Sequence, residues 1–135
     1  MFSFHHVALS VSNTEKSKKF YSYFGFETIH SWEAEDKSLA ITQMKLGESI
    51  LELFCFKNPG PLPDYEKKLF DGLKVVGVKH FGISTDSLEK AKARLENDGI
   101  AENIEITAGK TGINYFFIKD PDGILVEILE DKRNI

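Results

Sequence analysis

The chain is short of cysteine, of long apolar runs and of basic excess, and each shortage excludes a class of protein. Cys55 is the single cysteine, so no intramolecular disulfide is possible and a cytoplasmic location is expected. No stretch approaches the roughly 20 apolar residues that cross a bilayer, and the first residues lack the basic start and apolar core of a signal peptide. The formal net charge of -4 argues against nucleic acid and anionic membranes as partners.

What the sequence has instead is an internal repeat within a length, 135 residues, that suits one domain over 1–135. The first half aligns with the second at an offset of 74 through residues 5–26 and at an offset of 75 through 49–54. One additional residue in a loop explains the change. The repeat matches His6 with His80 and Glu52 with Glu127. Two unrelated strand-helix segments can share apolar periodicity by chance, but chance does not readily match histidine with histidine and glutamate with glutamate as well. We therefore interpret the repeat as a duplication.

Each half is predicted to fold as a strand, a helix and three further strands. Large apolar residues at 7, 9 and 11 alternate with small or polar residues at 6, 8 and 10, the period-2 pattern of a half-buried strand. Ser12 with Glu15, and Asp86 with Glu89, are the predicted helix caps, and a glycine stands where each helix should end. The later strands are predicted over 27–33, 38–45, 49–56, 102–107, 114–119 and 124–130.

The predicted fold class is therefore α+β, with two βαβββ modules in tandem. The first module spans 1–56 and the second spans 79–135. A linker over 57–78 joins them, and three prolines make its first part irregular. A short helix is predicted over 64–70.

Four polar residues are predicted on strand faces that the helices leave uncovered. His6 and His80 alternate with apolar residues of the first strand in each module, and Glu52 and Glu127 each lie between two apolar strand residues. Such a carboxylate is unfavourable to bury unless it is paired or metal-bound. Two imidazoles and two carboxylates suit Ni²⁺, Zn²⁺, Co²⁺, Fe²⁺ or Mn²⁺. If a pseudo-twofold relates the modules, the four residues converge on one open, catalytic type of metal site.

The other polar candidates are interpreted structurally. His5 is expected to point away from its metal-site neighbour, and His30 has no partner in the repeat. Cys55 is predicted to be a buried thiol. Asp120 and Asp122 belong to an Asp-Pro-Asp-Gly segment that is typical of a turn.

The sequence resembles the vicinal oxygen chelate superfamily, the group of glyoxalases, bleomycin-resistance proteins and dioxygenases. The resemblance rests on HHVALSV, FYSYFGF, LELF, GVKHFGIS and KDPDGILVEIL, and it covers nearly the whole chain. It implies paired βαβββ modules that form a cupped mixed sheet around one divalent metal. His6, Glu52, His80 and Glu127 occupy the four ligand positions, and no other cofactor is implied.

The His/Glu/His/Glu set resembles that of glyoxalase I-like lyases, the lactoylglutathione lyases. These enzymes isomerise a hemithioacetal through an enediolate whose charge the metal stabilises. The resemblance implies Glu127 as the first choice of proton-transferring base and Glu52 as the second. Ser10 and Phe56 stand where glyoxalase I usually has an arginine and an asparagine that contact glutathione. Glutathione is therefore disfavoured, which leaves another thiol cosubstrate, a 2-oxo compound or a CoA-linked substrate.

Three alternatives stay open within this resemblance. A CoA-ester epimerase shares proton abstraction beside a carbonyl, but commonly has glutamine at the position of Glu52. Extradiol dioxygenases and fosfomycin-type transferases normally lack an acidic ligand there. A drug-binding resistance protein of the bleomycin type generally lacks the metal set. The expected partners are a small-molecule substrate and a second copy in a homodimer, with the ligands drawn from one chain or from two.

Overall fold

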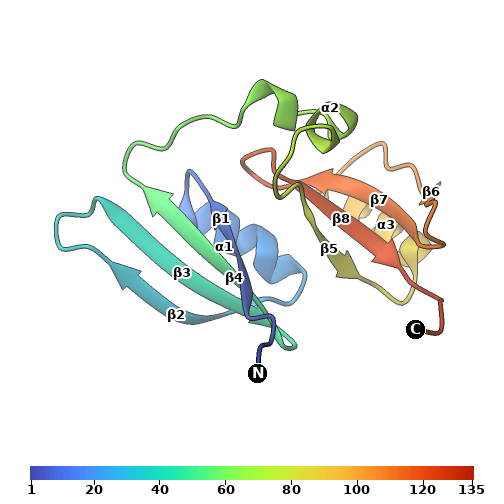
Figure 1. The fold of residues 1–135 in the computed structure, drawn as a ribbon, viewed down its shortest axis with the longest axis horizontal. Coiled ribbons are helices and arrows are strands. Elements are labelled where there is room, and N and C mark those ends of the chain that lie inside the picture. The colour runs from blue at the N-terminus through green and yellow to red at the C-terminus, as the bar shows by residue number, and fades with distance from the viewer. The chain divides into compact units, whose positions relative to one another are not determined.

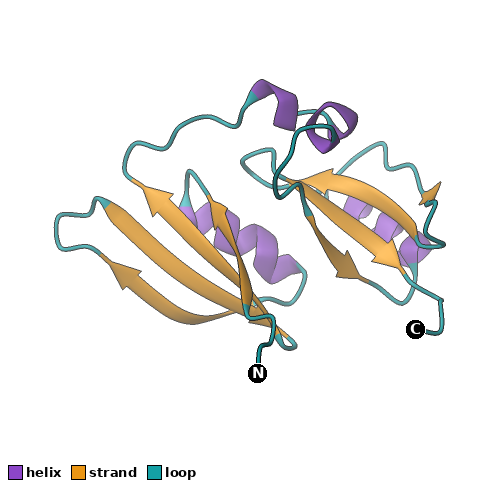
Figure 2. Ribbon diagram, viewed as in Figure 1, coloured by secondary structure: helices purple, strands orange, loops and turns teal.

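Both halves of the chain fold as a strand, a helix and three further strands (Figure 1; Figure 2). The computed structural model describes residues 1–135, in two units that we call unit 1, Met1–Pro61, and unit 2, Leu62–Ile135. No helix combines the length and the apolar character that crossing a membrane requires. Unit 1 contains β1 (His6–Ser10), α1 (Thr14–Tyr23), β2 (Glu27–Glu33), β3 (Leu39–Leu46) and β4 (Ser49–Phe56). Unit 2 contains η1 (Asp64–Glu66), α2 (Leu69–Leu73), β5 (Phe81–Ser84), α3 (Leu88–Asn97), β6 (Thr107–Ala108), β7 (Asn114–Lys119) and β8 (Leu125–Glu130).

The two sheets have the same topology. Their strand orders are β1-β4-β3-β2 and β5-β8-β7-β6, and in each the first strand pairs in parallel with the last. Ala8 pairs with Glu52 in unit 1, and Gly82 pairs with Glu127 in unit 2. These pairs are related by the same two offsets, 82 − 8 = 74 and 127 − 52 = 75, as the sequence repeat. The α+β class and the tandem βαβββ arrangement are confirmed.

Each sheet buries one face beneath the helix of its own unit (Figure 1). In unit 1, Leu51 and Leu53 of β4 are buried, and Tyr21 of α1 is fully buried. In unit 2, Val126 and Ile128 of β8 and Leu95 of α3 are buried in the same way. Because strand side chains alternate between faces, the residues between these positions lie on the opposite face, which we call the helix-free face. Glu52 and Glu127 are therefore on the helix-free faces.

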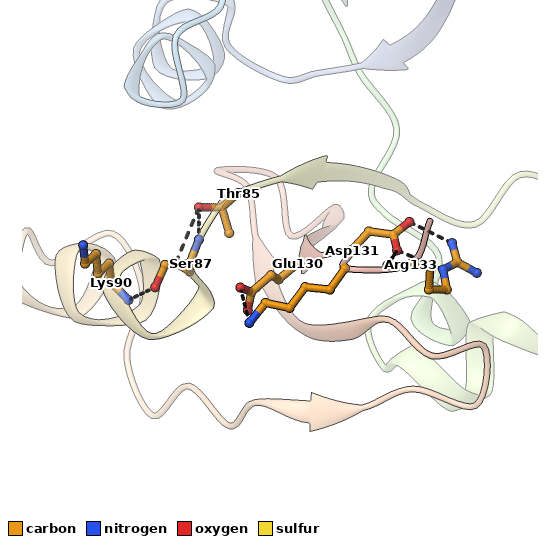
Figure 3. Close-up of polar contacts among 7 residues, drawn as sticks. Thr85, Ser87, Lys90, Glu130, Asp131 and Arg133 are labelled. Carbon is orange, nitrogen blue, oxygen red and sulfur yellow. Dashed lines mark hydrogen bonds and ion pairs between the residues drawn. The ribbon is translucent and has the colours of Figure 1, made fainter. Parts of the chain in front are cut away.

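The helix caps differ by one residue from those predicted at Ser12 and Asp86. Asn13 and Ser87 have the extended backbone of an N-cap, and each side chain accepts a hydrogen bond from the backbone N–H three residues further on, at 3.0 and 3.3 Å. Figure 3 shows the second cap, where the Ser87 N–H also donates to the Thr85 hydroxyl at 3.4 Å. In each module two residues that can cap a helix are adjacent in the sequence, and the helix begins after the second of them.

Two further boundaries differ from the predictions. Of the strand predicted over 102–107, only Thr107 belongs to a strand, the two-residue β6, and Asn103 has a left-handed backbone with φ of 54° that an extended strand does not contain. The single helix predicted over 64–70 is two short helices, η1 and α2, since the extended backbone of Lys68 separates them. The terminal glycines Gly25 and Gly99 have positive φ, as predicted for helix ends.

Candidate metal site

Unit 1 brings His6 and Glu52 together on its helix-free face. His6 opens the edge strand β1, and Glu52 lies on the neighbouring strand β4. The His6 Nε2 atom is 3.6 Å from Glu52 Oε1. The glutamate side chain is 16% exposed and the histidine 38%, so the carboxylate is largely desolvated while the imidazole remains accessible.

Unit 2 repeats this pairing with His80 and Glu127. His80 directly precedes β5, and its Nε2 atom is 3.2 Å from Glu127 Oε2. Both side chains are mostly buried, at 23% and 19% exposed. The sequence repeat thus identified two His/Glu pairs whose members are in contact, one in each unit.

Gln43 is a partner of the first pair that the sequence reasoning missed. Its side-chain amide donates a 2.6 Å hydrogen bond to Glu52 Oε2, the oxygen that does not face His6. Gln43 lies opposite Glu52 across the β3–β4 hairpin. The two-residue turn at Gly47-Glu48 sets this register, because paired positions in the hairpin sum to 95. A two-residue turn at Gly47-Glu48 is visible in the sequence, so the pairing of Gln43 with Glu52 could have been predicted from it.

His5 is a second missed partner. Its Nδ1 atom lies 2.9 Å from His6 Nδ1, so one imidazole donates to the other. His5 precedes β1, and strand alternation therefore does not turn it away as predicted. When His6 Nδ1–H is the donor, this hydrogen bond fixes the tautomer in which the His6 Nε2 lone pair is free for a metal.

The second pair has different surroundings. Phe117, the register partner of Glu127, lies where unit 1 has Gln43, and its ring meets the His80 ring edge to face at 4.8 Å. The buried His80 Nδ1 atom has no hydrogen-bond partner. Gly82 lets the Leu129 methyl group pack close to the backbone of β5, since an added Cβ would lie 2.6 Å from that methyl group and 3.6 Å from Glu127 Oε2.

The remaining candidates fall outside both pairs. Asp120 is a buried turn residue whose Oδ1 accepts backbone N–H bonds from Asp122 and Ile124, both at 2.9 Å, as expected of turn chemistry. Cys55 is a free, half-buried thiol on β4. His30 lies on β2 opposite Gln43 and is exposed.

The donor atoms of each pair are spaced nearly as adjacent ligands of a divalent ion are. Two ligands about 2.1 Å from such an ion lie about 3.0–3.4 Å apart at octahedral or tetrahedral angles. The unit 2 pair, at 3.2 Å, lies in this range, and the unit 1 pair, at 3.6 Å, lies just above it. No group of three or more His, Cys, Asp or Glu side chains gathers at metal-binding spacing. Each unit thus supplies two donors, and their union into one four-ligand site stays a prediction.

Comparison with known proteins agrees with this fold along almost the full length. The family model of the Glyoxalase/Bleomycin resistance protein/Dioxygenase superfamily matches residues 3–128. The uncharacterized protein YwkD of Bacillus subtilis (strain 168) is 32% identical over 130 residues, covering 95% of this chain and 96% of that protein. A glyoxalase family protein from Enterococcus faecalis superposes with a TM-score of 0.76 at 28% identity, over 95% of this chain and 97% of that one. Lactoylglutathione lyase from Agrobacterium tumefaciens shares the fold, with a TM-score of 0.63 at 24% identity over 96% and 94% of the two chains. The chain therefore belongs to the glyoxalase/bleomycin resistance protein/dioxygenase superfamily.

Proposed function

We propose that this protein is a divalent-metal-dependent lyase or isomerase of the glyoxalase I type, acting on a small 2-oxo compound or its thiol adduct. The observation that carries the proposal is the repeated His/Glu contact, at 3.6 Å in unit 1 and 3.2 Å in unit 2. Members of the superfamily commonly use divalent metals. His6, Glu52, His80 and Glu127 would hold the metal, which acts as a Lewis acid on the oxygens of the substrate.

The chemistry asked of the protein side chains is a proton transfer. In our proposal the Glu127 carboxylate takes the proton from the hydroxyl-bearing carbon beside the carbonyl and returns it to the carbonyl carbon, while the hydroxyl proton passes from one oxygen to the other, so that the reaction is an isomerisation without an external oxidant. The apolar neighbours of Glu127 and its low exposure, 19%, support this role because they limit exchange of the proton with water.

Metal binding is the first test. We expect about one divalent ion per set of four ligands, measured by metal analysis after dialysis against Ni²⁺, Zn²⁺, Co²⁺ or Mn²⁺. His6→Ala and His80→Ala should each lose it. Glu48→Gln is the matched control, since it removes a carboxylate that is 99% exposed and belongs to neither pair. A wild-type protein that stays metal-free with all four ions refutes the proposal.

The reaction is tested with the metal-loaded protein, methylglyoxal and a panel of thiols. We expect turnover with a thiol other than glutathione, because Ser10 and Phe56 offer neither of the two polar contacts inferred for glutathione. A metal-binding protein that turns over none of these mixtures would favour the epimerase alternative, which shares the proton abstraction.

We also propose a homodimer, with a mass about twice 15.3 kDa in sedimentation. A complementation experiment then locates the ligands. The His6→Ala/Glu52→Ala protein is mixed with the His80→Ala/Glu127→Ala protein after partial unfolding. Recovery of metal binding shows that each site joins unit 1 of one chain to unit 2 of its partner, and no recovery shows that each site belongs to one chain.

A further inference from the structure

The two His/Glu pairs match in sequence but differ in what holds them. In unit 1 both members have a polar partner, since His5 contacts the His6 Nδ1 atom and Gln43 bonds to Glu52. In unit 2 neither second partner is present. The Lys79 ammonium, which stands where unit 1 has His5, pairs instead with a carboxylate of η1 at 3.0 Å.

This asymmetry is sharpest at the two glutamates. Glu52 Oε2 accepts a short, 2.6 Å hydrogen bond in a part-buried position, and moving the carboxylate would leave the Gln43 amide without that partner. Glu127 has one polar contact, His80, at 3.2 Å. Across the strand it faces an aromatic ring, and the residue beside it on β5 is Gly82, which has no side chain that could hold it. The carboxylate of Glu52 is therefore anchored by a second polar partner, and that of Glu127 is not.

We propose that Gln43 is a positioning residue that makes Glu52 a fixed metal ligand and so reserves proton transfer for Glu127. This inference rests on the proposed function, because it divides the work of the two glutamates of that site. A carboxylate that transfers a proton must present a free oxygen and change its hydrogen bonding during the reaction. Removing an outer-shell partner of a ligand typically weakens metal binding about 10–100-fold, and the anchor should act in this way.

Gln43→Leu is the central test, with Co²⁺ as the probe. We expect the Co²⁺ affinity, measured by competition with a chelator, to fall about tenfold or more. The visible absorption spectrum of bound Co²⁺ should change because one ligand is no longer fixed, a readout that a general loss of stability does not move. Gln43→Asn keeps a neutral side-chain amide donor and should retain part of the affinity. Lys45→Leu is the matched control, since Lys45 is two residues away on the same face of β3 and pairs with Ile50.

The glutamate variants complete the test. Glu52→Gln should lose more Co²⁺ affinity than Glu127→Gln, while Glu127→Gln should lose the isomerisation, because it lacks the carboxylate that transfers the substrate proton. The inference is overturned if Gln43→Leu binds Co²⁺ with wild-type affinity and spectrum, if Lys45→Leu loses as much, or if Glu52→Gln and Glu127→Gln behave alike. In each of these cases metal binding by the wild type leaves the proposed function standing. A wild type that binds no Co²⁺ or other divalent ion overturns both.

Discussion

Phe116 and Phe117 are adjacent on β7, and the structure predicts very different costs for removing them. Phe116 is 2% exposed on the helix-covered face, opposite the buried Ile128. Its truncation to alanine leaves a core cavity and should cost about 3–5 kcal/mol. Phe117 is half-buried on the helix-free face. Its truncation opens to solvent and should cost about 1–2 kcal/mol, from roughly half the burial of a phenylalanine and its ring contact with His80.

These costs convert into separable melting temperatures. An unfolding entropy of about 2.1 cal/mol/K per residue gives about 0.28 kcal/mol/K for 135 residues. A loss of about 4 kcal/mol then lowers the Tm by about 14 °C, and a loss of about 1.5 kcal/mol lowers it by about 5 °C.

Thermal unfolding followed by far-UV circular dichroism measures both variants. Phe116→Leu serves as a milder core variant in case Phe116→Ala does not fold. The face assignment, and with it the placement of Glu127 beside Phe117, is refuted if Phe117→Ala costs as much as Phe116→Ala. Co²⁺ binding provides the complementary readout, because Phe117→Ala should alter the His80 site while Phe116→Leu should not.

Three further predictions follow from polar contacts. Asn13→Ala and Ser87→Ala should each lower the free energy of unfolding by about 1 kcal/mol in urea titrations, and unchanged midpoints would contradict the assigned caps. Asp120→Ala leaves two backbone N–H groups without their acceptor and should cost about 1–3 kcal/mol by the same assay; a neutral result would show that the turn does not need it. Hydrogen bonds from Arg133 lower the pKa of Asp131 from 3.8 to about 2. Because the pKa is lower in the folded state, the ionised carboxylate stabilises the fold above pH 3.8, and this stabilisation is lost as the pH falls through 2. Asp131→Asn should therefore flatten the dependence of Tm on pH in that window. Parallel profiles for variant and wild type would refute the assignment.

The elements were largely predictable because alternation and turn chemistry are local. The strands predicted over 27–33, 49–56 and 114–119 are observed with those bounds. The strand predicted over 102–107 was wrong, since Asn103 near its start has a left-handed backbone and only Thr107 of that range pairs in a strand. A left-handed residue inside a short apolar pattern leaves no clear signal in one sequence.

The contacts within each candidate pair were predictable for a different reason. Equivalent positions in a duplicated fold take equivalent places, so the repeat identified two histidines and two glutamates whose contacts the structure contains. Gln43 and His5 lie outside that signal, because the repeat places Phe117 and Lys79 at their positions. Aligning the two halves of the sequence does not reveal supporting residues that differ between the halves.

The additional residue of the second half lies between Phe117 and Glu127. Gln43 and Phe117 still match at an offset of 74, while Glu52 and Glu127 match at 75, so the β7–β8 turn absorbed the change. A strand slip of one residue would instead have turned Glu127 toward α3. After duplication, natural selection could therefore tolerate a longer loop but not a change of parity along the strand, and lineages of this fold should vary in turn length while keeping each ligand on its face.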